Sequence, residues 1–83
     1  SDELAGDILR VLTIFNNVLW ESEILWEVQG MNSTLNVEVD LSKLGEKLKD
    51  LEKEGIITMD TRIKGSISGE NKEENLVKLL YPS

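Results

Sequence analysis

The 83-residue sequence contains no cysteine and no histidine. Without cysteine there is no disulfide framework, no thiolate nucleophile and no thiolate metal site. Without histidine the chain lacks the commonest general base and the commonest ligand of transition metals. No apolar run approaches the length of about 18 residues that a membrane-spanning helix needs. The start, Ser1-Asp2-Glu3, has no basic leader, so we expect a cytoplasmic, intracellular protein that does not enter a membrane.

The motifs of common enzyme classes are also missing from the sequence. There is no phosphate-binding loop, no glycine-rich dinucleotide fingerprint and no calcium-binding loop. Carboxylates are numerous, but no pair is set among apolar residues in a way that would raise a pKa. We therefore expect no enzyme, no metal site and no cofactor.

Charge is unevenly distributed along the chain. Sixteen acidic residues face nine basic ones, which gives a net charge of −7. Eight acids and a single base, Arg10, lie in residues 1–40, whereas residues 41–83 hold eight acids and eight bases. Such an asymmetry is informative about partners rather than about fold.

Apolar residues at helical spacing predict three helices. The first covers residues 2–16. The second covers residues 23–29, with Ser22 as its N-cap and Gly30 as its stop. The third covers residues 41–54, between the N-cap Asp40 and Gly55. The connector, residues 31–39, is either a short strand or an extended loop.

Alternating residues predict a β-hairpin over residues 56–81. The first strand runs from Ile56 to about Ile67, a turn occupies residues 69–72, and the return strand covers residues 75–81. Residues 18–20 are long enough only for a short strand. The apolar faces together predict a core of Leu4, Ile8, Val11, Phe15, Ile24, Val28, Leu41, Leu44, Leu48, Leu51, Ile57, Ile63, Val77 and Leu79.

The element order and one motif-like stretch resemble the winged helix-turn-helix family. The stretch is Leu44-Gly45-Glu46-Lys47-Leu48-Lys49-Asp50-Leu51-Glu52-Lys53-Glu54-Gly55-Ile56-Ile57. In that family a leucine-rich third helix often runs through a glycine into the first strand of the wing. The resemblance implies a single α+β domain, a three-helix bundle with a two- or three-stranded antiparallel wing. The nine-residue connector is longer than the tight turn usual in the family.

The resemblance also implies DNA binding by the third helix and the wing. The candidate contact residues are Ser42, Lys43, Lys47, Lys49 and Lys53 of the helix, with Arg62 and Lys64 of the wing. Residues 41–54 nevertheless contain no Arg, Asn or Gln, the side chains that make bidentate contacts with bases. Glu46 and Asp50 stand at the centre of the outward helix face, and the wing tip is acidic. These carboxylates oppose a phosphate backbone.

Trp26 is the clearest candidate for a protein contact. At about 100° per residue it points away from Ile24 and Val28, and tryptophan is enriched at the centres of protein interfaces. Glu23 and Glu27 flank Trp26 on the same helix. In the alternative interpretation, the connector folds over Trp26 and buries it beside Leu35 or Val37. Ile67 is a separate apolar candidate for a protein contact, and continued strand pairing is the alternative interpretation for it.

Two functions therefore stand as hypotheses. The first is a winged-helix module that binds another protein, within an assembly that handles nucleic acid, its partner carrying a basic or Lys/Arg-flanked segment. The alternative is a DNA-binding transcriptional regulator, although charge disfavours duplex DNA. A homodimer is left open, and it would use the first helix or the connector.

Overall fold

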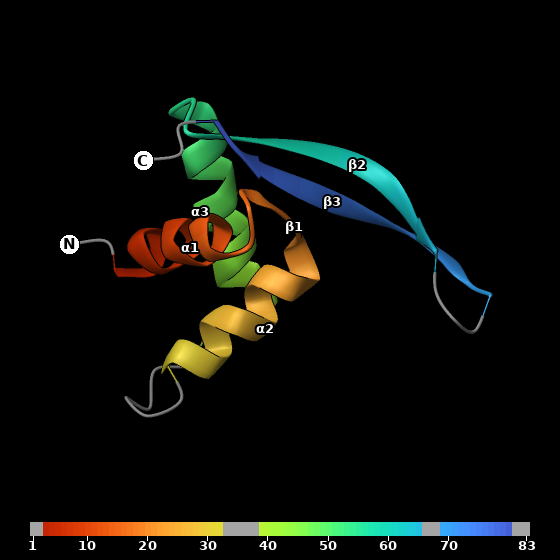
Figure 1. Ribbon diagram of the computed structural model, residues 1–83, viewed down its shortest axis with the longest axis horizontal. Coiled ribbons are helices and arrows are strands. Elements are labelled where there is room, and N and C mark those ends of the chain that lie inside the picture. Colours follow the sequence, from red (N-terminus) through yellow and green to blue (C-terminus); the bar gives the residue numbers. More distant parts are fainter. Residues whose placement is uncertain (1–2, 33–38, 66–68, 81–83) are drawn as a thin grey trace.

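The computed structural model describes residues 3–32, 39–65 and 69–80. Three helices, α1 (Glu3–Ile14), α2 (Glu21–Asn32) and α3 (Leu41–Lys53), and three strands, β1 (Val18–Trp20), β2 (Ile57–Gly65) and β3 (Asn71–Leu79), follow one another in the order α1-β1-α2-α3-β2-β3. The strands form one antiparallel sheet in the order β1-β3-β2. The helices gather at one end of the molecule and the β2–β3 hairpin extends away from them (Figure 1). This is an α+β fold consistent with a winged helix, as predicted.

Helix α1 ends two residues earlier than predicted because of the residues that follow it. Asn16 and Asn17 both have positive φ, at 62° and 72°, and asparagine tolerates this left-handed conformation better than most residues. The turn closes with the Asn17 N–H donating to the Leu12 carbonyl at 2.6 Å. Phe15 is thereby carried out of the helical stripe and is 41% exposed, so its predicted place in the core is wrong.

Helix α2 begins at Glu21, directly after β1, and Ser22 lies in its first turn. The prediction of Ser22 as N-cap is therefore wrong. The Trp20 backbone N–H donates to Glu23 Oε1 at 3.2 Å, which is one half of a capping box with Glu23 at the third helical position. Gly30 lies inside the helix, which continues to Asn32.

Helix α3 begins at Leu41, as the sequence predicts, and ends at Lys53, one residue before the predicted end. The Asp40 side chain accepts a hydrogen bond from the Lys43 N–H at 2.8 Å, the usual geometry of an N-cap. At the other end Gly55 has φ +77°. The N–H groups of Gly55 and Ile56 donate to the carbonyls of Glu52 and Leu51, which is a Schellman motif.

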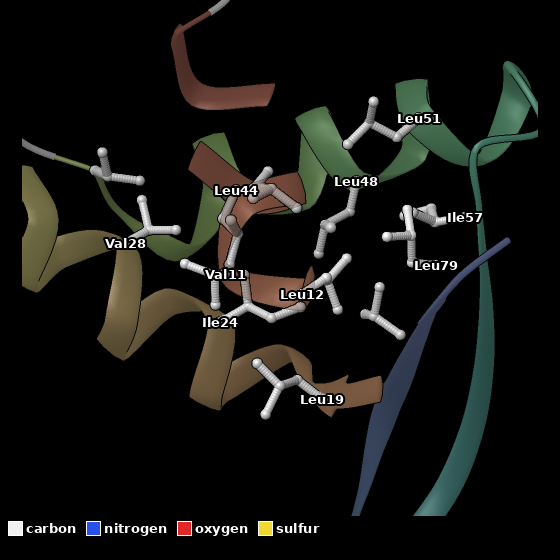
Figure 2. Packing of buried hydrophobic residues seen from close by; sticks show 13 residues of the cluster. Val11, Leu12, Leu19, Ile24, Val28, Leu44, Leu48, Leu51, Ile57 and Leu79 are labelled. Carbon is white, nitrogen blue, oxygen red and sulfur yellow. The ribbon is translucent and has the colours of Figure 1, made fainter. Parts of the chain in front are cut away.

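The core lies between the three helices and the near end of the sheet (Figure 2). Ten of the fourteen predicted core residues are buried, and Leu4 is half-buried against them. Leu19 and Val39 are buried as well, although each was predicted only as part of a short strand or connector. Leu41, at the first position of α3, is 56% exposed, so its predicted burial is wrong.

The hairpin is longer on its return side than predicted. Strand β3 begins at Asn71, not at residue 75, and pairs with β2 from Ile57↔Leu79 to Gly65↔Asn71. It is also the central strand, because Leu19 of β1 pairs with Val77 on its other edge. The far half of the hairpin passes beyond the helices, which leaves Ile63 68% exposed and its predicted burial wrong. Tyr81 lies outside the described residues.

Candidate protein-binding surface

Trp26 projects from α2 into solvent. Its side chain is 74% exposed, whereas Ile24 and Val28 on the opposite side of the helix are fully buried. The predicted direction of Trp26 is confirmed, and the alternative in which it is buried is wrong. Leu35 and Val37, its suggested cover, lie outside the described residues. A large apolar side chain this exposed is a feature of interaction sites.

Two hollows lie on either side of Trp26. The smaller hollow has a volume of about 180 Å³, and its described lining includes Phe15, which directly follows α1, together with Leu19 and Trp26. The larger, about 510 Å³, continues along α2 past Gln29 and Gly30 to Met31. We call Phe15, Trp26 and Met31, with the acidic residues Glu23 and Glu27 beside them, the Trp26 surface. Phe15 and Met31 were missed as surface residues from the sequence, because their exposure depends on where α1 and α2 end.

The charge of this surface is of one sign. Glu23 and Glu27 both line the smaller hollow, and Glu27 also lines the larger. Among the described residues that line the two hollows none is basic. The Trp20 N–H holds the Glu23 carboxylate in place at the start of α2. The surface thus combines aromatic and thioether groups with fixed negative charge. Ile67, the fourth predicted contact residue, lies outside the described residues.

The predicted DNA-contact residues of α3 are mostly exposed. Ser42, Lys43, Lys49 and Lys53 lie at the surface. Lys47 is half-buried, and its Nζ lies 3.8 Å from Asp50 Oδ2. Part of the positive charge of α3 is therefore compensated by a carboxylate on the same helix.

The wing bases lie on the side of the sheet that faces away from the core. Side chains alternate along a strand, and Ile57 at the start of β2 is buried, so Arg62 and Lys64 point the other way. Arg62 pairs with Asp60 at 3.7 Å. Lys64 has a structural role: its Nζ lies 3.6 Å from Glu74 Oε2, 3.5 Å from Ser22 Oγ and 5.5 Å from the centroid of the half-buried Trp20 ring.

Glu74 joins the wing to the start of α2. Its Oε1 accepts a hydrogen bond from the Ser22 backbone N–H at 2.7 Å, so β3 supplies a cap that the local sequence of α2 lacks. Burial raises the pKa of the Glu74 carboxyl, but hydrogen bonds from Ser22 and the nearby charge of Lys64 outweigh it, and the pKa lies below its ordinary value of 4.5. From sequence, Glu74 was only one acid of the wing tip.

No known protein family and no curated protein matches this chain. Within the described residues, no helix is both long and apolar enough to cross a membrane. The same residues contain no group of three or more acidic, histidine or cysteine side chains placed to bind a metal ion.

Proposed function

We propose that this chain is a non-enzymatic module of the winged-helix family that binds another protein through the Trp26 surface. The observation that carries the proposal is Trp26 itself, 74% exposed between two hollows. Exposed aromatic residues seated beside concave apolar surface are the residue type and setting that dominate binding energy in protein interfaces. The helix and strand order supports membership of the family.

The charge around Trp26 favours a particular kind of partner. An apolar segment flanked by Lys or Arg would cover Phe15 and Trp26 and bring its cations near Glu23 and Glu27. Attraction between opposite charges would speed the encounter and lose strength at high salt. We place such a partner in an intracellular, cytoplasmic assembly that handles nucleic acid, a setting with which the absence of cysteine agrees.

Site-specific photocrosslinking tests this proposal in the intact protein. Phe15 is replaced by p-benzoylphenylalanine, which keeps an aromatic ring beside Trp26, and the protein is irradiated in its own cells. We expect a discrete crosslinked protein whose attached peptide, mapped by mass spectrometry, carries Lys or Arg next to apolar residues. Trp26→Ala in the same chain should abolish that crosslink.

A matched control keeps the experiment specific. The same photoreactive residue at Glu52, an exposed position of α3, should not give this product. A product formed equally at Glu52, or one that survives Trp26→Ala, would contradict binding through the Trp26 surface.

The alternative, a DNA-binding regulator, draws its support from exposed Lys43, Lys49 and Lys53 on α3. The wing adds little, because Arg62 pairs with Asp60 and Lys64 is held by Glu74. We expect no tight binding to random duplex DNA near physiological salt. Affinity that falls steeply with salt, and that weakens in Lys49→Ala and Lys53→Ala, would promote this alternative.

A further inference from the structure

A second groove lies on another part of the molecule. It has a volume of about 420 Å³ and is bordered by the start of α2, the first residue of α3 and the wing. Leu25 and Leu41 supply its apolar lining, and Thr61 and Glu73 supply the wing side. It shares only Ser22 with the described lining of the hollows beside Trp26. The groove is therefore distinct from the Trp26 surface.

The apolar part of the groove is open to solvent. Leu41 is 56% exposed, although it is the first residue of a helix whose other leucines are buried. Ile63 is 68% exposed, and it lies two residues beyond Thr61 on the same side of β2. Leu41 and Ile63 thus leave apolar area uncovered in and beside this groove, which is a feature of interaction sites.

The charge of the groove is negative. The core-facing side of the wing is the side that carries the buried Ile57 and Val77. By strand alternation it carries no Lys or Arg within residues 57–65 and 71–79, because the wing bases occupy the opposite side. Glu73 lies on this core-facing side, and Glu21 borders the groove from α2. A ligand that fits this groove is cationic as well as apolar.

Hydrogen bonds hold the walls of the groove together. The Thr61 hydroxyl donates to Asn75 Oδ1 at 3.0 Å, and Asn75 Nδ2 donates to Glu21 Oε1, also at 3.0 Å. The Ser22–Glu74 hydrogen bond adds a second connection between α2 and β3. A groove whose walls are already in place requires less ordering when a ligand binds.

We propose that this groove docks an extended segment of a partner protein, with an apolar side chain over Leu25 and Leu41 and an adjacent Lys or Arg facing Glu21 and Glu73. The argument is charge complementarity on an uncovered apolar lining, and it does not depend on the Trp26 surface. Duplex DNA is the wrong occupant, because phosphates at this position would meet the carboxylates of Glu21, Glu73 and Glu74, and the described lining of the groove includes no Lys or Arg. The chain would then have two separate docking places for protein.

Peptide selection tests the proposal with the full chain. A random dodecapeptide library displayed on phage is selected against the immobilised protein at low salt, and the enriched peptides are synthesised and titrated. We expect one enriched group in which an apolar residue stands next to Lys or Arg. Its affinity should fall about 10-fold or more in Leu41→Asp and in Glu73→Lys, and remain unchanged in Trp26→Ala.

Thermal melts establish that the variants are folded, and Glu73→Gln provides a milder variant that should weaken binding less than Glu73→Lys. Three results would overturn the proposal: no basic-apolar group is enriched, the enriched peptides bind Leu41→Asp as well as wild type, or their binding is lost only in Trp26→Ala. The last result would support the proposed function while removing this groove. A duplex DNA probe that competes with the peptides and depends on Leu41 would also overturn it.

Discussion

The helical end of the molecule and the far half of the wing are stabilised by different forces. At the helical end, Ile8, Leu44 and Leu48 are fully buried among apolar neighbours. The far half of the wing buries little, and it is joined to the rest by the contacts of Glu74 and Lys64 with Ser22. Burial of apolar surface responds weakly to pH and salt, whereas charged hydrogen bonds respond to both. One small chain therefore has two parts that solution conditions affect differently.

The largest expected effect comes from emptying the helical core. Leu48→Ala removes a fully buried side chain that faces α1 and the sheet (Figure 2). We expect a loss of about 2–5 kcal/mol in the free energy of unfolding, from lost transfer free energy and the cavity left behind. Urea denaturation measures it. An unchanged midpoint would mean that α3 is not packed on the core as described.

A smaller effect should follow from cutting the connection between the wing and α2. Glu74→Ala removes the carboxylate that caps the Ser22 N–H, and losing a cap of this kind costs about 0.5–2 kcal/mol. Hydrogen exchange should show faster opening of β3 residues 71–75, with the helices less affected. Glu73→Ala is the matched control, because Glu73 is exposed on the same strand. Equal effects of the two variants would contradict a specific role for Glu74.

Acid should remove the same contribution without a change of backbone. The pKa of Glu74 in the folded state lies below its ordinary value of 4.5. Its stabilising contribution is therefore present above that value and is lost as the pH falls through the lower folded pKa. The difference in unfolding free energy between wild type and Glu74→Gln should shrink on acidification. A difference that stays constant down to about pH 2 would contradict this assignment.

The smallest effect on stability is expected at Trp26. Because the ring is mostly in solvent, Trp26→Ala should change the free energy of unfolding by no more than about 0.5 kcal/mol. Burial of the ring would instead make the loss about 3–5 kcal/mol. Urea midpoints of Trp26→Ala and Leu48→Ala, measured side by side, provide the sharpest contrast between exposed and buried apolar residues in this chain.

Local sequence patterns predicted those structural features that depend only on residues close together in the sequence. The stripes of α1 and α3, the Asp40 cap and the Gly55 stop follow from spacing and residue type alone, as does the outward direction of Trp26. Phe15, Leu41 and Ile63 were assigned to the core because their spacing fits it. Their exposure depends instead on where the Asn16–Asn17 turn, the start of α3 and the end of the hairpin lie in space.

The two candidate surfaces differ in the same way. Trp26, Glu23 and Glu27 share one helix, so periodicity was enough to group them. The groove joins α2 and Leu41 to Thr61 and Glu73 of the wing, residues far apart in sequence. The Glu74 cap on Ser22 likewise spans 52 positions. No local window contains both partners, so the pairing could only come from the folded structure.

The order of the strands has a consequence for how the chain assembles during synthesis. β3 is central in the sheet, yet it follows every other described element in sequence. On the ribosome, β1 and β2 have no partner strand until residues 71–79 have emerged. Until then the core between the helices lacks Val77 and Leu79. The strand pairs that bring these residues into place join positions about sixty residues apart, such as Val18↔Lys78. Contacts of such long sequence separation slow folding. We therefore expect the sheet and the core to form together, in a single late step.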